Sequence, residues 1–232
     1  MGAFIPLPVR VPLWIQWLYP RYIWHLPAKE KVVYLTFDDG PIPEVTPWVL
    51  DLLDTYDAQA TFFCIGENVL KHPELFQSLE ERGHAVGNHT QHHLHGWKST
   101  VQEYVKDVQD ADRAFAKALQ QGAPNTPQEN NSEGSYRLFR PPYGKIKRKQ
   151  ARALENLGYR IIMYEVIAKD WDARLNGYQC TANVLKHVRP GSLVVFHDSI
   201  KAQKNLRDCL PQILSAMQKQ GYRFKRIPVL SQ

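Results

Sequence analysis

The sequence predicts an α/β protein with parallel strands, and a recurring local pattern is the main reason. A helical stretch, a glycine, a ring-bearing residue and a strand follow one another at 81–89, 156–166 and 219–229. Glycine accepts the left-handed backbone conformation in which many helices end, so each unit marks a helix that stops just before a strand. A further apolar run at 192–196 follows an Arg-Pro-Gly turn. Helices and strands that alternate in this way build parallel sheets, and both a doubly wound sheet and a (β/α) barrel fit the pattern.

The composition agrees with a globular fold. The 232 residues are 44% hydrophobic and 22% charged, with 16 Pro and 13 Gly, which excludes disorder, collagen and coiled coil for the whole chain. This length suffices for one large domain. The three cysteines, Cys64, Cys180 and Cys209, are too few for a disulfide scaffold. We expect free buried thiols, with a Cys180–Cys209 bridge as the alternative.

Residues 1–29 are predicted to form a separate arm rich in aromatic residues and proline. Prolines at positions 6, 8, 12 and 20 favour an extended arm packed on the domain; an aromatic and basic contact with a membrane surface or the cell envelope is the alternative. The segment fits no standard secretion signal, because its first basic residue is Arg10 and prolines interrupt it. Its uncharged run at 11–20 is too short to span a bilayer. A cytoplasmic location, or one peripheral to the inner membrane, fits these features best.

Residues 30–232 are predicted to form the main domain, which starts with a regular alternation of elements. A β-branched apolar run predicts a strand at 31–38. Thr46 as N-cap and Pro47 as the first helical residue predict a helix at 46–56. A second strand is expected at 58–65, and a helix at 72–82 that stops at Gly83. The polar segment 121–135 is predicted to be a surface insertion.

The net charge of +6 suggests an anionic partner: nucleic acid, a membrane face or an acidic polymer. The densest basic run, at 145–152, has no interleaved aromatic residues and is typical of a solvated first turn of a helix. We therefore expect no nucleic-acid binding. The sequence does not indicate an oligomeric state.

Two adjacent carboxylates, Asp38 and Asp39, end the first strand and precede Gly40-Pro41. The carboxyl ends of parallel strands carry the active site in α/β folds. Neighbouring carboxylates repel, so one of the pair is expected to bind a cation or to have a raised pKa. A simple turn followed by a helix cap is the alternative.

Five of the nine histidines lie between positions 84 and 95. On a helix, His89 and His93 would share a face and could present two imidazoles to one ion, whereas His92 would point away. Two histidines and one carboxylate, with coordination positions left open, form a catalytic metal site and not a structural one. His84 and His95 receive no role.

Three further motifs could carry chemistry. Two prolines at 141–142 rigidify the backbone between Arg140 and Tyr143, which suggests an anion site or a carboxylate partner for the arginine. Trp171, in Asp170-Trp171, could stack on a sugar or belong to the core. His197 ends the apolar strand at 193–196 and is either a general acid or base or a buried structural histidine.

Taken together and in this order, the motifs resemble the polysaccharide deacetylase family (carbohydrate esterase family 4, the NodB homology domain). The matching segments are TFDDGP at 36–41, His-Thr-x-x-His at 89–93, Arg-Pro-Pro-Tyr at 140–143, Asp-Trp at 170–171 and a hydrophobic strand ending at His197. The resemblance extends from about residue 30 to the C-terminus. It implies a deformed (β/α) barrel with about seven parallel strands in a single domain. It also implies one divalent metal ion, commonly zinc, with Co²⁺, Ni²⁺ and Mn²⁺ as alternatives.

The resemblance also implies a role for each matching residue. The metal ligands would be Asp39, His89 and His93. Asp38 would be the general base, held in place by Arg140, and His197 the general acid, oriented by Asp170. The Tyr143 amide would face the developing oxyanion. The remaining substrate contacts would come from Pro142, Trp171 and Leu193.

The implied reaction is the hydrolysis of N-acetyl groups on an amino-sugar glycan. O-acetyl xylan, a small cyclic amide and a catalytically silent glycan-binding protein are the alternatives. The sequence departs from the family at one position: Ile167 stands where the family often has an aspartate. This departure concerns the shape of the groove and hence the choice of substrate, and the sequence does not identify the glycan.

Overall fold

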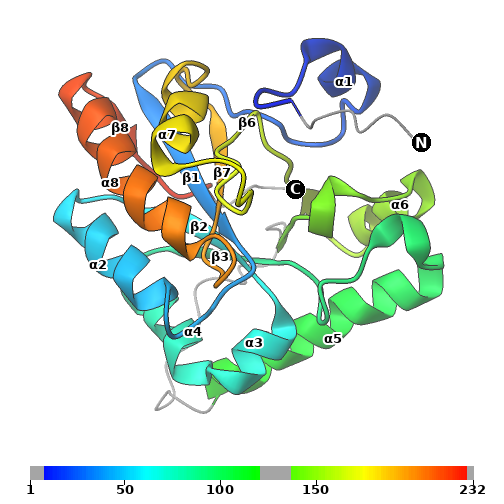
Figure 1. Ribbon diagram of the computed structural model, residues 1–232. Helices are drawn as coiled ribbons and strands as arrows, with labels where there is room; N and C mark the ends of the chain where they lie inside the picture. The colour runs from blue at the N-terminus through cyan, green and yellow to red at the C-terminus, as the bar shows by residue number, and fades with distance from the viewer. Residues whose placement is uncertain (1–7, 121–136, 229–232) are drawn as a thin grey trace.

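The computed structural model describes residues 8–120 and 137–228 (Figure 1). The predicted insertion at 121–135 lies outside these residues. Parallel strands follow the order β5-β4-β3-β2-β1-β7-β6, and β8 pairs with β1. The strands are β1 (Val32–Asp38), β2 (Ala60–Cys64), β3 (Ala85–Asn88), β4 (Arg137–Phe139), β5 (Tyr159–Ile161), β6 (Val166–Ile167), β7 (Leu193–His197) and β8 (Arg223–Phe224). The predicted deformed barrel of about seven parallel strands is confirmed.

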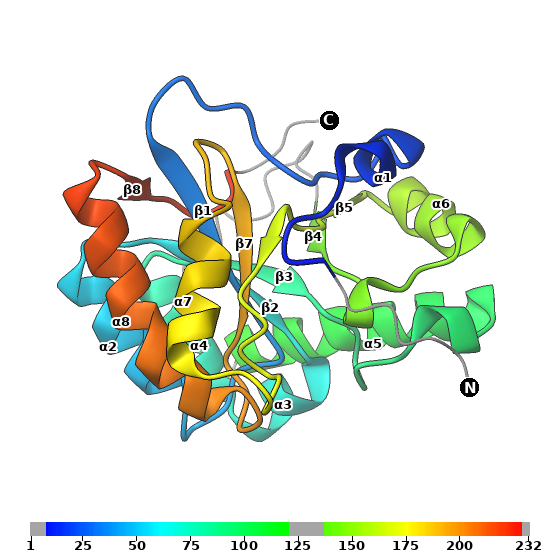
Figure 2. The ribbon, with the colours of Figure 1, turned by 45° about the horizontal axis from the view of Figure 1, so that its top comes forward.

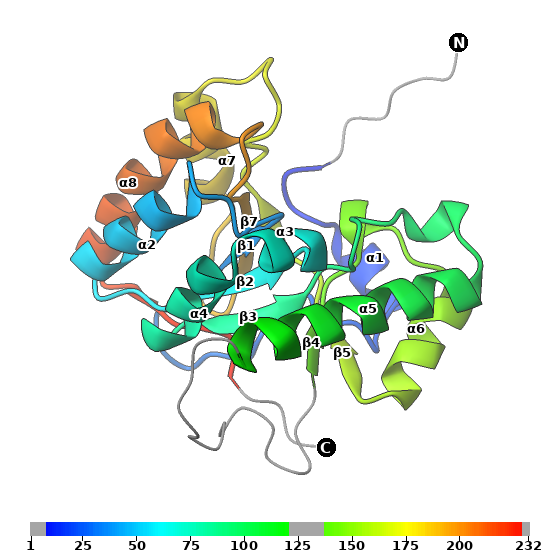
Figure 3. The same cartoon turned by 90° about the horizontal axis from the view of Figure 1, so that it is seen from below.

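Helices lie around the outside of the curled sheet (Figures 1 and 3). They are α1 (Leu13–Leu18), α2 (Thr46–Thr55), α3 (Gly66–Lys71), α4 (Pro73–Glu81), α5 (Val101–Gln120), α6 (Arg148–Asn156), α7 (Gly177–Leu185) and α8 (Gln203–Lys219). Seen from below, the long helix α5 runs beneath β3 and β4 (Figure 3). None of the described helices combines the length and the apolar character that crossing a bilayer would require.

The central strand β1 organises the core. All seven of its residues are buried, as expected for a strand covered on both faces. The Phe37 ring stacks on Phe62 of β2 and on Phe196 of β7, at centroid distances of 5.0 and 5.6 Å. These contacts hold together the three central strands β2, β1 and β7, of which β1 and β7 end at the site.

The glycines of the recurring pattern have the conformation that the pattern predicted. Gly83, Gly158 and Gly221 have φ values of 79°, 82° and 82°, each two positions after the last residue of a helix and just before a strand. An L-residue with a side chain is strained at such angles, so glycine is what allows these helices to stop where they do. The three cysteines are free and buried, as expected.

The predicted N-cap at Thr46 is wrong. Thr46 is the first residue of α2, and Val45 precedes the helix without a side-chain cap. The Thr46 hydroxyl instead donates a hydrogen bond of 2.6 Å to Asp198 and accepts one from the Ile42 amide. The hydroxyl that could have capped the helix locally is thus hydrogen-bonded to a residue 152 positions away in the chain.

The N-terminal arm lies between the two strands at the ends of the sheet. Arg10 forms an antiparallel bridge with Val166 of β6, and Ile23 forms a parallel bridge with Ile162, just after β5. The arm therefore covers the opening that the curled sheet leaves between β5 and β6. The domain boundary between residues 29 and 30 stays a prediction.

The prediction of an extended arm is wrong at residues 13–18, where the chain forms the short helix α1. This segment is free of proline and directly follows Pro12, whose φ of −57° suits the start of a helix. Pro20 limits the helix on its other side, because proline cannot donate the next backbone hydrogen bond.

A buried carboxylate ties the arm to the barrel. Glu165 is fully buried and accepts hydrogen bonds from Arg10 (2.7 and 3.1 Å), Arg189 (2.8 Å) and Ser192 (2.8 Å). We expect Glu165→Gln to lower the free energy of unfolding by about 2–3 kcal/mol, because charge-assisted bonds are lost in a buried position. Urea denaturation measures this loss. Glu67→Gln, which removes only an exposed pair with Lys71, is the control and should leave the urea midpoint unchanged; equal midpoints for the two variants would contradict the prediction.

Candidate active site

Eight of the eleven predicted site residues meet in one pocket at the carboxyl ends of the strands. The pocket has a volume of about 490 Å³. Its lining includes Asp38, Asp39, His89, His93, Arg140, Tyr143, Trp171 and His197. These residues follow β1, β3, β4, β6 and β7, so the parallel sheet collects side chains that are up to 159 positions apart.

Asp39, His89 and His93 form a group that could hold a metal ion. One potential ligand atom from each lies within 4.8 Å of the others. The Asp39 Oδ1 atom is 3.3 Å from His93 Nε2 and 3.8 Å from His89 Nε2. This oxygen is buried and has no hydrogen-bond partner among the described residues. A buried carboxylate oxygen without a donor is costly unless a cation satisfies it, so these three residues fit a metal ion.

Hydrogen bonds prepare both imidazoles to act as ligands. The Nδ1 atom of His89 lies 2.8 Å from the Arg140 carbonyl oxygen, to which it can only donate. Its Nε2 atom therefore keeps a lone pair directed toward Asp39. Burial lowers the pKa of His89, and burial together with the neighbouring His89 lowers the pKa of His93 to about 4. Both rings are thus neutral at pH 7, which is the form that binds a metal.

His89 and His93 do not lie on a helix, the arrangement in which their spacing would place both rings on one face. Strand β3 ends at Asn88, and the next residues form a loop in which Thr90 and His93 have φ values of 67° and 53°. A right-handed helix cannot contain these angles. The two rings nevertheless converge, with centroids 5.1 Å apart, because the loop turns back on itself.

Asp107 on α5 holds this loop in place. Its Oδ2 atom accepts hydrogen bonds from the backbone amides of Gln91 (3.0 Å) and His92 (3.1 Å), and its Oδ1 atom lies 2.6 Å from His92 Nδ1. His92 therefore points away from the candidate metal ligands, as expected. Asp107 was not among the predicted site residues, because a single acidic residue in an amphipathic helix gives no signal of such a role.

Asp38 and Arg140 form a buried ion pair. The Arg140 Nη1 atom donates hydrogen bonds of 2.7 Å to Asp38 Oδ1 and to the Thr36 hydroxyl. Its Nη2 atom donates to the Met163 carbonyl oxygen at 2.8 Å, and the guanidinium lies 4.1 Å from the Phe63 ring centroid. Burial is the largest single influence and raises the pKa of Asp38, but the charge and hydrogen bond of Arg140 together with the nearby His89 and His197 outweigh burial and hold this pKa below its usual value. The geometry thus matches the carboxylate partner expected for Arg140.

His197 and Asp170 form the second pair. The His197 Nδ1 atom lies 2.9 Å from Asp170 Oδ1, and the His197 backbone amide donates to Asp170 Oδ2 at 2.7 Å. Burial is the largest single influence and lowers the pKa of His197, but the charge and hydrogen bond of Asp170 together with the Asp39 and Asp38 charges outweigh burial and raise this pKa to about 9. His197 is therefore protonated at pH 7. The Trp171 ring packs against it at a centroid distance of 4.7 Å and lines the pocket.

Tyr143 closes the pocket near His93. Its backbone is left-handed, with φ of 60°, directly after the two prolines. Its hydroxyl lies 3.1 Å from His93 Nδ1, and its ring stacks on His95 at 5.1 Å. His95, which received no role from the sequence, therefore contributes to the wall of the site through Tyr143.

Two residues predicted to contact the substrate are absent from the lining of the described pocket. Leu193 is fully buried at the start of β7, in a cluster with Leu26 and Tyr34, about 13 Å along the strand from His197. Val195, two residues closer to His197 on the same face of β7, lines the pocket instead.

Pro142 is also buried away from the pocket, whereas Pro141 lines it. Ile167 lines the pocket as well, and it replaces a carboxylate by an apolar surface at this point of the wall.

Asp198 supports the loop that carries Asp39, a role that the sequence analysis did not assign. Its Oδ1 atom accepts a hydrogen bond of 3.0 Å from the Gly40 amide, and its Oδ2 atom accepts one from the Thr46 hydroxyl. A Cβ atom at Gly40 would come within 2.0 Å of Asp198 Oδ2, which explains why glycine follows the two aspartates. The only hint in the sequence was that Asp198 follows His197.

Comparisons with known proteins agree with the geometry. A family model described as polysaccharide deacetylase matches residues 25–162. The chain is 34% identical over 208 residues to a peptidoglycan-N-acetylglucosamine deacetylase of Bacillus cereus, which covers 89% of this chain and 91% of the relative. It is 32% identical over 212 residues to a chitooligosaccharide deacetylase of Bradyrhizobium sp., which covers 86% of this chain and 90% of the relative.

Solved structures show the same arrangement of the chain. The crystal structure of the Bc1960 peptidoglycan N-acetylglucosamine deacetylase superposes with a TM-score of 0.80 at 28% identity, over 94% of this chain and 95% of that one. The Xyl-CE4 domain of a multidomain xylanase from a termite hindgut metagenome superposes with a TM-score of 0.71 at 26% identity, over 86% and 88% of the two chains.

Proposed function

Because the chain belongs to the polysaccharide deacetylase family, we propose that it hydrolyses the N-acetyl amide of N-acetylglucosamine residues in a glycan of the peptidoglycan or chitooligosaccharide type. One observation carries this proposal. A candidate metal site, Asp39 with two histidines, lies in a single pocket with an ionised carboxylate, Asp38, and a protonated imidazole, His197.

Asp39, His89 and His93 would hold the metal, and we propose zinc, because two neutral imidazoles and one carboxylate are the usual donors of a catalytic zinc ion. When bound, the metal would polarise the acetyl carbonyl and lower the pKa of a water molecule.

The residues on either side of this site have complementary tasks. Asp38 is the general base: its low pKa keeps it ionised, and Arg140 occupies Oδ1, so Oδ2 takes the proton of the attacking water. The Tyr143 amide stabilises the negative charge that develops on the carbonyl oxygen. His197 is the general acid and protonates the amine nitrogen, which cannot leave as an anion.

The walls of the pocket place the acetyl group. Trp171, Val195 and Ile167 supply apolar surface beside His197, and an acetyl methyl group fits such a surface. In this assignment Asp170 orients His197, and the sugar stays at the mouth of the pocket.

The test is acetate release from a panel of acetylated glycans, with the metal content measured in parallel. We expect release from peptidoglycan fragments or N-acetylglucosamine oligomers, loss of this release with a chelator, and recovery on adding back a divalent metal. Acetylated xylan is the comparison substrate, because one structural relative is a domain of a xylanase. Acetate from xylan but not from the amino-sugar glycans would overturn the proposed substrate, and release that a chelator does not affect would overturn the metal site.

Replacing Asp170 is expected to move the pH profile. Without its carboxylate the imidazolium of His197 loses its main stabilising charge, so the pKa of His197 falls from about 9. Asp170→Asn should therefore move the alkaline limb of the kcat profile to lower pH by at least about one unit, since the general acid then loses its proton earlier. The control is Asp172→Asn, whose carboxylate pairs with Arg174 on the surface and should leave the profile unchanged. An unmoved alkaline limb in Asp170→Asn would remove His197 from the role of general acid.

A further inference from the structure

Helix α1 holds four large apolar side chains out into solvent. Trp17 is 75% exposed, Trp14 60%, Leu18 56% and Leu13 49%, and no residue of this helix is buried. A contiguous exposed apolar surface on a soluble protein marks a contact with an apolar partner.

The segments on both sides of α1 are firmly anchored, so this exposure is not that of a loose end. Val11 and Trp24 are buried in the core cluster that includes Tyr159 and Val195. The Val11 amide donates to the Glu165 carbonyl at 2.9 Å, and the Trp24 indole donates to the Tyr19 carbonyl at 3.2 Å. The protein therefore fixes α1 in place with its tryptophans directed outward.

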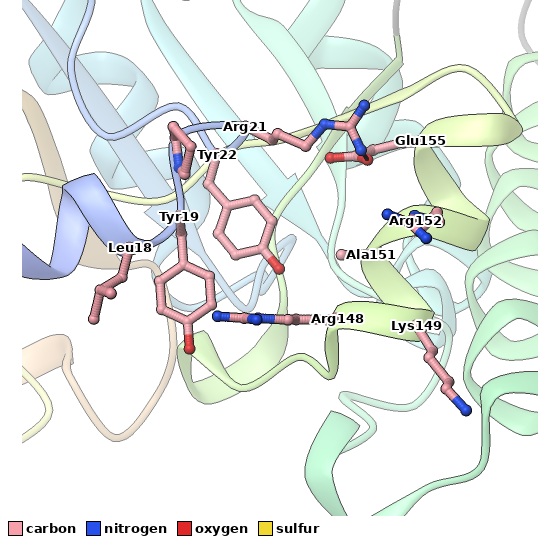
Figure 4. Close-up of a pocket in the computed structure, with 10 residues that line it drawn as sticks. Leu18, Tyr19, Arg21, Tyr22, Arg148, Lys149, Ala151, Arg152 and Glu155 are labelled. Atoms are coloured by element: carbon pink, nitrogen blue, oxygen red, sulfur yellow. Dashed lines mark ion pairs between the residues drawn. The ribbon is translucent and has the colours of Figure 1, made fainter.

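Cations lie beside one end of this apolar surface, next to Leu18. Helix α6 lies beside α1 (Figure 2), and a hollow of about 330 Å³ separates them. Figure 4 shows that Arg21, Arg148, Lys149 and Arg152 line the hollow. Glu155 is the one acidic residue among its described lining residues, and its carboxylate lies 3.4 Å from Arg21.

The floor of the hollow is aromatic. The rings of Tyr19 and Tyr22 stack with centroids 5.3 Å apart, and the Arg148 guanidinium lies 5.6 Å from the Tyr19 centroid. The hollow thus offers apolar surface inside and positive charge at its rim.

We propose that this surface binds an anionic phospholipid bilayer. The α1–α6 face, as we name it, consists of Leu13, Trp14, Trp17 and Leu18 together with Arg21, Arg148, Lys149 and Arg152. Its tryptophans and leucines would enter the region between headgroups and acyl chains, which indole side chains favour. Its cations would contact the lipid phosphates, each strengthening binding about fivefold near an anionic surface at moderate salt.

Other occupants fit this face less well. A second copy of the chain in a two-fold contact would bring the same four cations against each other, which is repulsive. A nucleic acid or a soluble acidic glycan would satisfy the arginines and could stack on the indoles, but it would leave Leu13 and Leu18 without an apolar partner. An anionic bilayer supplies both negative charge for the cations and an apolar interior for the leucine and tryptophan side chains.

The test is cosedimentation of the full chain with vesicles of phosphatidylcholine, with and without 30% phosphatidylglycerol. We expect binding to the anionic vesicles, at least tenfold weaker binding to the neutral ones, and weakening of the anionic binding as salt is raised. Tryptophan emission should shift to shorter wavelength when the protein binds.

Two variants test the two halves of the face. Trp14→Ser with Trp17→Ser should weaken partition to anionic vesicles at least tenfold and remove the emission shift. Both side chains are mostly exposed, so the melting temperature should not change. The matched control is Tyr178→Ser with Ile200→Ser, two side chains that are 77% and 56% exposed outside this face.

Arg148→Gln, Lys149→Gln and Arg152→Gln together should weaken the partition about a hundredfold at low salt. Their charge-matched control is Lys186→Gln, Lys219→Gln and Lys225→Gln, three exposed lysines outside this face. Hydrolysis of a soluble substrate should be unchanged in all four variants, so the proposal stands or falls independently of the proposed function.

Three results would overturn the proposal. The first is that the variants of the α1–α6 face and their controls partition equally to anionic vesicles. The second is a dimer in sedimentation experiments that Trp14→Ser with Trp17→Ser converts to a monomer. The third is that the chain binds DNA or a soluble acidic polysaccharide more tightly than anionic vesicles.

Discussion

Asp38→Asn is expected to lower kcat by about three orders of magnitude while the protein keeps its metal. The substitution preserves the Oδ1 atom that accepts from Arg140, so the buried hydrogen bond remains. It removes the basic oxygen that takes the proton of the attacking water, and general-base catalysis of this kind contributes about 10²–10⁴-fold. Acetate release measures the loss, and metal analysis of the purified variant measures the stoichiometry.

Asp39→Ala is the matched comparison, because the two carboxylates are adjacent in the chain but are assigned different tasks. It removes the buried Oδ1 atom that has no other partner among the described residues, so the metal should be lost along with activity. If Asp38→Asn lost the metal and Asp39→Ala retained it, the two roles would have to be exchanged. Substantial turnover in Asp38→Asn, in samples that are folded and loaded with metal, would remove Asp38 as the base.

Arg140→Met should cost about 3–5 kcal/mol of unfolding free energy, the largest effect on stability that we predict. Arg140 is 2% exposed and donates to a carboxylate, a hydroxyl and two carbonyl groups. Removing it leaves Asp38 charged and buried without a partner, which is the costly way to break a buried ion pair. Urea denaturation at pH 7 measures the loss.

The double variant Asp38→Asn with Arg140→Met separates this cause from simple loss of packing. Once residue 38 is neutral, the loss of the guanidinium leaves no unpaired charge at that position, so the double variant should be about 1–3 kcal/mol more stable than the sum of the single losses predicts. Additive losses would contradict the ion-pair explanation and leave the packing of Arg140 against Phe63 as the cause.

The sequence by itself determined the alternation of elements and eight of the residues that line the pocket. Gly83, Gly158 and Gly221 could be interpreted locally, because a helix that ends in a left-handed glycine is specified by residues next to one another. The five motifs could likewise be recognised without a structure. Each lies at the carboxyl end of a strand, where a parallel sheet brings such segments together whatever their separation in the chain.

Only the tertiary structure decided how the site is assembled. His89 and His93 converge through a loop with two left-handed residues and not through a helix. Asp107 holds the backbone of that loop, and the Arg140 carbonyl oxygen holds the His89 ring. Val195 and not Leu193 reaches the pocket, because the register in which β7 pairs with β1 decides which residues of β7 lie level with the site. The Gly40 loop depends on Asp198, 158 residues away, and α1 is held outward by contacts of the arm with β6 and with the segment after β5. A local pattern cannot contain such partners, because the contacts form only after distant segments have packed together.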